Sequence, residues 1–211
     1  MRGLFITMEG PDGSGKTTQM KKTAEYFIDQ GYEVLLTREP GGTLIGEKIR
    51  EIILDKKHVE MDSITETLLY AASRAQHVAE VIRPAIEEGK IVICDRFVDS
   101  SLVYQGFGRN LGLELVEEIN KAAVQGIMPD ITFLFKLSPH IGIQRKLCQG
   151  NGDRLEQEKL DFHDRVFEGY MALEKRYPQR IKGIDASGSI EEIHGEIVQY
   201  IEVLLKHRGS I

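Results

Sequence analysis

A run of residues near the N-terminus, 10–18, has the composition and order needed to hold phosphate groups. It fits the pattern Gly-x-x-x-x-Gly-Lys-Ser/Thr. Its glycines let backbone N–H groups point into one concavity, and a helix that begins there adds its positive end. Lys16 can then reach the β and γ phosphates of a nucleotide, and Thr17 can bind Mg²⁺. We therefore expect a nucleoside triphosphate to be held by Gly10, Pro11, Asp12, Gly13, Ser14, Gly15, Lys16, Thr17 and Thr18.

Three further charged clusters suit phosphoryl transfer. Asp95 and Arg96 follow an apolar run, where the acid can hold Mg²⁺ through water and the planar guanidinium can bridge two phosphates. The other two are 38–42 (Arg-Glu-Pro-Gly-Gly) and 153–158 (Asp-Arg-Leu-Glu-Gln-Glu), the latter after a Gly-rich stretch that suits a closing lid. A structural ion pair, a tight turn and a solvated helix start are the respective alternatives. A GTPase is excluded, because Asn120-Lys121 is followed by two alanines and not by the x-Asp that reads guanine.

Short apolar runs alternate with helical patterns, which predicts an α/β fold with a parallel sheet covered on both faces. The expected strands are 4–8, 34–37, 91–94, 131–135 and, more weakly patterned, 181–185. The expected helices are 20–30, 43–54, 63–87, 112–125, 158–176 and 189–206. Two of them have the form of capping boxes, Ser63 with Glu66 and Ser189 with Glu192. Pro84 should kink or split the helix 63–87, because proline removes a backbone donor and clashes with the preceding turn.

Composition places the chain among ordinary globular proteins. It has 211 residues, 41% hydrophobic and 28% charged, which argues for one domain, 1–211, and against disorder or a fibre. A net charge of −6 argues against polynucleotide and membrane-surface partners. Cys94 and Cys148 have neither zinc-ligand spacing nor a disulfide framework around them. No targeting or membrane-spanning segment is visible, so we expect a cytoplasmic protein.

The chain resembles the thymidylate kinase family over nearly its whole length. The resemblance rests on the phosphate loop and on five further segments, namely 37–42, 69–74, 95–106, 129–130 and 153–158. It implies a three-layer α/β/α P-loop NTPase fold with a five-stranded parallel sheet. It also implies an enzyme that converts dTMP to dTDP with ATP and Mg²⁺ by direct in-line phosphoryl transfer, and that forms a homodimer. The helical positions Leu68, Ala71, Ala72 and Ala75 are either that dimer interface or core facing the sheet.

The resemblance also implies roles for individual residues. The catalytic residues would be Asp12, Lys16, Arg96 and Arg154, and the metal-side residues Thr17 and Asp95. Tyr70 would stack on the thymine ring, Arg74 would donate to a thymine carbonyl, and Tyr104 would crowd the 2′ position of the sugar. The remaining substrate contacts would be Glu39 and Arg50 at the acceptor phosphate and metal, Arg96 between the substrates, and Ser100, Ser101 and Gln105 at the base edge. For the two tyrosines the alternative is a core aromatic, and for Arg74 a surface charge.

The source of a further catalytic arginine divides the family. Gly13 stands where some relatives carry arginine, which resembles the bacterial type with the arginine in the lid, here around 142–158. Arg145 and Arg154 lie at the two ends of a stretch without other arginines, and Arg154 is the better-matched position. None of the six histidines, His58, His77, His140, His163, His194 and His207, is expected to act as a ligand or base.

Two other functions stay open at this stage. A different acceptor, such as dUMP or a deoxynucleoside, would need the same chemistry. A regulatory protein that holds ATP without transferring its phosphate is argued against by the joint presence of Asp12, Lys16, Thr17, Asp95 and Arg96.

The lid assignment generates the first testable prediction. Because an arginine supplied to the developing charge is worth about 10³ or more in rate, Arg154→Ala should lower turnover far more than Arg145→Ala. The measurement is kcat of the two variants, and equal, small effects would contradict a lid-arginine mechanism.

Overall fold

The computed structural model describes residues 2–138, 141–142 and 153–208. Its centre is a five-stranded parallel sheet in the order β2-β3-β1-β4-β5. The strands are β1 (Leu4–Glu9), β2 (Val34–Arg38), β3 (Ile91–Asp95), β4 (Ile131–Lys136) and β5 (Ile181–Asp185). The predicted sheet and its weakest strand are therefore both confirmed.

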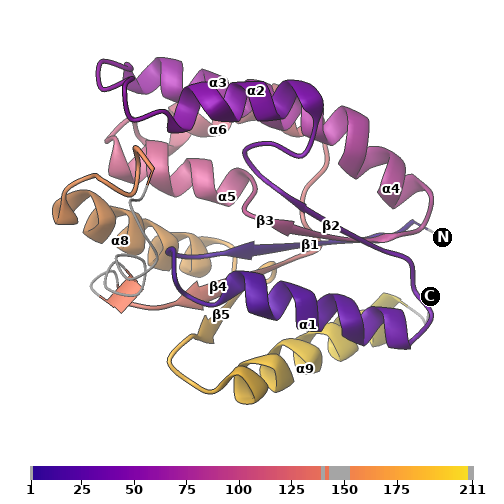
Figure 1. The fold of residues 1–211 in the computed structure, drawn as a ribbon. Coiled ribbons are helices and arrows are strands. Elements are labelled where there is room, and N and C mark those ends of the chain that lie inside the picture. The colour runs from indigo at the N-terminus through magenta and orange to yellow at the C-terminus, as the bar shows by residue number, and fades with distance from the viewer. Residues whose placement is uncertain (1, 139–140, 143–152, 209–211) are drawn as a thin grey trace.

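Helices cover both faces of the sheet, as Figure 1 shows. α1 (Lys16–Asp29) and α9 (Ile190–Arg208) lie on one face. The other face carries α2 (Leu44–Leu54), α3 (Ser63–His77), α4 (Arg83–Glu87), α5 (Val98–Ser101), α6 (Leu113–Val124), α8 (Leu160–Arg176) and two π-helical segments, η1 (Val78–Ile82) and η2 (Leu102–Gly108). This is the three-layer α/β/α arrangement expected from the sequence. In the described part of the chain, no helix is both long and apolar enough to cross a lipid bilayer.

The strands read as unbroken apolar runs because both of their faces are buried. In β1, Leu4, Ile6 and Met8 pack in the cluster that includes α1 and α9, whereas Phe5 packs against η1 and α4. All four side chains are fully buried. This two-sided burial removes the polar alternation seen in half-exposed strands.

Two local predictions have opposite outcomes. The capping box of Ser189 and Glu192 is confirmed, with the Ser189 hydroxyl donating to Glu192 over 2.7 Å. The box predicted for Ser63 and Glu66 is wrong, because Asp62 caps α3 by accepting from the N–H of Ile64. Glu66 is instead buried, and its carboxylate pairs with the guanidinium groups of Arg109 and Arg154.

The long helix predicted for 63–87 is split, as the proline suggested. α3 ends at His77, the π-helical segment η1 follows, and Pro84 occupies the first turn of α4, where its missing N–H costs nothing. The change of pitch shifts the later residues relative to α3. His77, the last residue of α3, is fully buried, and its Nε2 lies 2.7 Å from the hydroxyl of Thr37 in β2.

Two glycines allow α8 to lie unusually close to η2. A Cβ on Gly169 would lie 2.8 Å from the ring of Phe107, and one on Gly108 would lie 2.6 Å from the ring of Phe162. Real Cβ atoms do not approach neighbours so closely. The close packing matters for the site, because Gly169 precedes Tyr170, a buried tyrosine whose hydroxyl reaches the end of β1.

Alanine substitutions at two helical glycines should have opposite effects on stability. Gly195→Ala in α9, where a Cβ meets nothing within 4 Å, should raise the free energy of unfolding by about 0.5–1 kcal/mol through helix propensity. Gly169→Ala should lower it by about 1–3 kcal/mol, because the ring of Phe107 must move. Urea unfolding of both variants tests this, and a destabilised Gly195→Ala would contradict the assignment.

Candidate functional site

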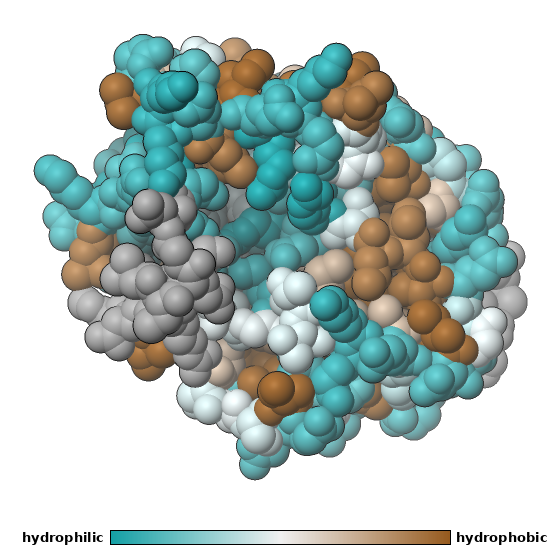
Figure 2. Space-filling view, viewed as in Figure 1, coloured by the Kyte–Doolittle hydropathy of each residue, from teal (hydrophilic) through white to brown (hydrophobic). Residues whose placement is uncertain are grey.

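A cavity of about 460 Å³ lies at the carboxyl edge of the sheet. It opens as a hollow lined by hydrophilic residues in the space-filling view (Figure 2). The structure brings together most of the residues singled out from the sequence. Its lining includes Asp12, Gly13, Ser14, Gly15, Lys16, Thr17, Thr18, Glu39, Arg50, Tyr70, Arg74, Asp95, Arg96, Ser100, Ser101, Tyr104 and Gln105. Arg38, Asp153, Glu156 and His163 line it as well.

The phosphate loop connects β1 to the first residue of α1. Gly15 adopts a left-handed backbone, with φ 89°, directly before the helix begins at Lys16. The Lys16 ammonium donates to the carbonyls of Gly10 and Pro11 over 3.0 and 2.9 Å, so these two residues contribute through their backbones. Burial and the nearby Arg96 charge lower the pKa of Lys16 to about 8. Thr17 and Thr18 stay exposed to the cavity.

Arg96 lies between the loop and the rest of the cavity. It has a left-handed backbone, φ 68°, immediately after β3. Its guanidinium donates to Asp12 over 2.9 Å and lies 5.2 Å from the centre of the Tyr104 ring. Asp12 is also 3.9 Å from the Lys16 ammonium. Three charged groups that can contact phosphate or its metal ion are thus held together by their contacts with one another.

Asp95 and Thr17 fit the metal role expected of them. One carboxylate oxygen of Asp95 is buried and accepts no hydrogen bond within the described residues. Thr17 lines the same cavity. Hard oxygen donors beside bound phosphates are what Mg²⁺ requires.

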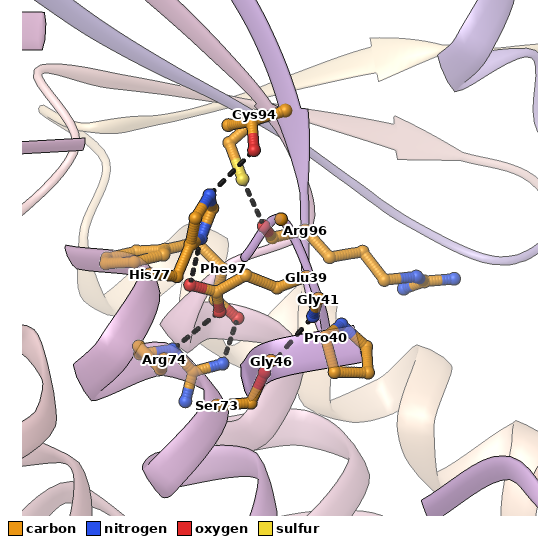
Figure 3. Close-up of polar contacts among 12 residues, drawn as sticks. Glu39, Pro40, Gly41, Gly46, Ser73, Arg74, His77, Cys94, Arg96 and Phe97 are labelled. Carbon is orange, nitrogen blue, oxygen red and sulfur yellow. Dashed lines mark hydrogen bonds and ion pairs between the residues drawn. The ribbon is translucent and has the colours of Figure 1, made fainter. Parts of the chain in front are cut away.

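A buried ion-pair cluster supports the deeper end of the cavity. The Arg74 Nε lies 2.8 Å from Glu39 Oε2, and His77 Nδ1 lies 3.0 Å from Glu39 Oε1. His77 Nε2 is also 2.7 Å from the Thr37 hydroxyl. Figure 3 shows Glu39 between Arg74 and His77, with the Arg96 side chain extending away from this cluster. Arg74 is 2% exposed, so the surface-charge alternative is wrong for it.

His77 has a structural role that the sequence analysis did not identify. Its position three residues after Arg74 on the same helix was the available signal, because residues with this spacing share a helix face. Glu9 was missed too. It is the last residue of β1, fully buried, and accepts from the Phe97 N–H over 2.7 Å. The signal in the sequence for Glu9 was an acidic residue at the end of a buried apolar strand.

The side chains expected at the base edge are held by neighbours in the protein. Gln105 donates through Nε2 to Glu66 over 2.9 Å, while its Oε1 is buried without a hydrogen bond in the described part of the chain. Ser101 accepts from Arg74 over 3.1 Å. Burial and the charge of Glu66 raise the pKa of Tyr70, which lines the same region. Its hydroxyl is therefore neutral.

Arg50 and Arg38 lie at the side of the cavity formed by the segment after β2. Arg50 donates to the carbonyl of Pro40 over 2.9 Å. Arg38 makes a two-point ion pair with Glu47, at 3.0 and 2.9 Å. Both arginines line the cavity, so two further cations are available to an anionic ligand.

The structure does not bring Arg154 into the cavity. Its Nε donates to the carbonyl of Ile53 over 2.8 Å, and its NH2 donates to Glu66 over 2.6 Å. Glu66 is fully buried and also accepts from Arg109 over 3.0 Å. Burial opposes ionisation of Glu66, but the bonds from Arg109, Gln105 and Arg154 outweigh it and lower its pKa. A buried carboxylate thus engages the guanidinium of Arg154, and the catalytic role expected for this residue stays a prediction.

Part of the predicted lid 142–158 lies outside the described residues. These include Arg145, the other arginine considered for catalysis. Described residues at its C-terminal end do reach the site, since Asp153 and Glu156 line the cavity.

Known proteins with the same sequence pattern share one description. A family model described as thymidylate kinase matches residues 8–197. The thymidylate kinase of Exiguobacterium sibiricum is 50% identical over 211 residues, covering 100% of both chains. That of Geobacillus sp. (strain WCH70) is 52% identical over 195 residues, 92% of this chain and 93% of the relative. The crystal structure of thymidylate kinase from Ehrlichia chaffeensis matches with a TM-score of 0.77 and 35% identity, covering 96% of this chain and 99% of that one.

The environment of Glu66 predicts a large and specific loss of stability. Glu66→Gln should lower the free energy of unfolding by about 3 kcal/mol or more, because it leaves buried guanidinium charge without a carboxylate. Glu158→Gln is the matched control, since it removes a partly exposed partner of the same Arg109 and should cost about 1 kcal/mol or less. Urea unfolding at neutral pH distinguishes the two, and equal losses would contradict this account.

Proposed function

The chain belongs to the thymidylate kinase family, and we propose that it transfers the γ-phosphoryl group of ATP to dTMP directly and in line. The enzyme is a thymidylate kinase, which phosphorylates dTMP to dTDP. The observation that carries the mechanism is that one cavity contains both the phosphate loop and the cluster around Arg74, with Arg96 between them. Two substrates bound at these ends would meet beside Arg96.

The loop residues bind and neutralise the donor phosphates. Its backbone N–H groups and the N-terminal end of α1 face the ligand, and Lys16, which donates to the carbonyls of Gly10 and Pro11, has a third hydrogen for a phosphate oxygen. Thr17 and Asp95 would hold Mg²⁺, which when bound draws charge from the phosphates and fixes their orientation. Asp12 keeps Arg96 directed at this region.

Arg96 bridges the two substrates in this proposal. Its planar guanidinium offers parallel N–H groups to the oxygens on which charge develops during transfer. Lys16 serves the donor side in the same way. Arg154 would have to leave Glu66 and Ile53, which engage it in the arrangement described, to reach the transferring group.

The other end of the cavity suits a thymine base. The unpaired Oε1 of Gln105 is an acceptor for the ring N–H that thymine and uracil carry and cytosine lacks. Glu66 keeps this oxygen toward the base by accepting from the amide nitrogen of Gln105. Tyr70 stacks on the ring, Arg74 and Ser101 serve its polar edge, and Tyr104 crowds the sugar. Arg50 and Glu39 lie on the acceptor-phosphate side, and Ser100 supports Arg96.

We also propose a cytoplasmic homodimer whose interface includes α2 and α3. Leu68 of α3 is 52% exposed and Ala72 is exposed, whereas Ala71 is buried. The predicted apolar stripe is therefore part surface and part core. α2 adds Leu44 and Ile45, which are 76% and 51% exposed beside it, and such exposed apolar groups favour burial against a second copy.

Acceptor choice tests the proposed site. We expect ADP release with MgATP to be fastest with dTMP, slower with dUMP, and absent with thymidine, which lacks the acceptor phosphate. The thymine methyl should contribute about 10- to 200-fold. We expect turnover of dCMP to be about 10⁴-fold lower than that of dTMP. The ring nitrogen of cytosine is an acceptor and would face Gln105 Oε1, which is also an acceptor.

Lys16→Ala is the control, and it should abolish turnover with every acceptor while leaving the folded state intact by circular dichroism. Preference for thymidine would contradict the phosphate roles given to Arg50 and Arg96. Turnover of dCMP close to that of dTMP would contradict the role given to Gln105.

A further inference from the structure

Glu9 has an environment that a mere core residue does not need. It ends β1 and is fully buried, yet its carboxylate accepts from four donors. Oε1 accepts from the N–H groups of Phe97 and Ser100, over 2.7 and 3.3 Å. Oε2 accepts from the hydroxyls of Ser100 and Tyr170, over 2.6 and 2.9 Å. These donors come from α8 and from the segment that follows Arg96.

The two hydroxyls connect Glu9 to the Arg96 guanidinium. Each hydroxyl has a single hydrogen, which it donates to Glu9. The oxygens of Ser100 and Tyr170 therefore present lone pairs on their other side, and Arg96 NH1 lies 3.2 Å from each of them. Two oxygens that accept from one nitrogen define the plane in which that guanidinium lies.

The same carboxylate also fixes the backbone that carries Arg96. Arg96 has the left-handed φ of 68°, which is unfavourable for a side chain of this type. The bond from the Phe97 N–H to Glu9 begins at the very next residue. On the other side, Arg96 NH2 is held by Asp12 over 2.9 Å. Arg96 is thereby fixed at its main chain and at both terminal nitrogens.

We propose that Glu9 is a positioning residue for phosphoryl transfer. Its carboxylate sets the directions of the Ser100 and Tyr170 hydroxyls, and these orient the Arg96 guanidinium between donor and acceptor phosphates. The inference rests on the function proposed for Arg96. It predicts that Glu9 and Tyr170 affect the rate of transfer more than the binding of either substrate.

The state of ionisation of Glu9 supports the proposal. Burial and the charge of Asp99 raise the pKa of Glu9 to about 7, while Arg96 and the bond from Ser100 act in the opposite direction. The other charged or titratable groups that face it are Lys16, Tyr104, Tyr170, Cys94 and Arg180. A proton on Glu9 would have to be donated to one of the hydroxyl oxygens, which would turn that hydroxyl hydrogen toward Arg96. The active arrangement is therefore the ionised one.

Tyr170→Phe tests the link without touching a substrate contact. We expect kcat for dTMP phosphorylation to fall about tenfold, the effect of one hydrogen bond to a charged group. The dissociation constants of dTMP and ATP should change less than about twofold. Tyr177→Phe is the matched control, because it removes a tyrosine–glutamate bond of 3.0 Å, to Glu117, away from the cavity. Its kcat should equal that of the wild type.

Glu9→Gln tests the carboxylate itself. We expect kcat to fall about 10²-fold and to lose the rise with pH around neutrality that ionisation of Glu9 predicts for the wild type. Adding Tyr170→Phe to Glu9→Gln should lower kcat little further, because the two act through one network. If Glu9→Gln fails to fold, kcat measured against pH in Tyr170→Phe and in Tyr177→Phe still tests the proposal. Only Tyr170→Phe should then differ from the wild type.

The outcomes separate this inference from the proposed function. In a wild-type enzyme that is active on dTMP, an unchanged kcat in Tyr170→Phe would overturn the positioning role alone. Losses of kcat in the two single variants that are fully additive in the double variant would do so too. Loss of thermal stability in Tyr170→Phe with no loss of kcat would do the same. A wild type without dTMP-dependent ADP release would instead overturn the proposed transfer mechanism.

Discussion

Several arginines in the described part of this enzyme lie where buried carboxylates hold them. Glu39 pairs with Arg74, Glu66 with Arg109 and Arg154, and Asp99 with Arg180 over 2.8 Å. Charges removed from water are tolerated when they are paired and hydrogen-bonded, so each acid fixes the guanidinium that satisfies it. The rest of the site depends on this constraint. An arginine that meets phosphate must be kept in place by something other than the phosphate.

The sheet supplies the frame for these acids. Because all five strands are parallel, their carboxyl ends meet at one edge, and Glu9, Glu39 and Asp95 lie at or just beyond the ends of three adjacent strands. The close approach of α8 to η2 through Gly169 and Gly108 then brings Tyr170 to the same edge. The packing of α8 against η2 therefore determines where the Tyr170 hydroxyl lies relative to Glu9 and Arg96.

Sequence reasoning succeeded where the determinants are local. The phosphate loop, the buried strands and the split at Pro84 each follow from a few consecutive residues, and each was predictable. Sequence reasoning failed where the interaction partners of a residue lie far from it in the sequence. Glu66 illustrates this twice: the capping box assigned to it with Ser63 is wrong, and it pairs with Arg154, whose catalytic role stays a prediction. His77 and Glu9 were missed for the same reason, because their partners lie 38 and 88 or more positions away.

The lysine of the phosphate loop is held by the backbone of that loop. The Lys16 ammonium already has two carbonyl oxygens as partners, those of Gly10 and Pro11. An ammonium carries three hydrogens, so one remains for an oxygen of a bound phosphate. The two backbone carbonyls therefore fix the direction in which the charge of Lys16 can act on a ligand.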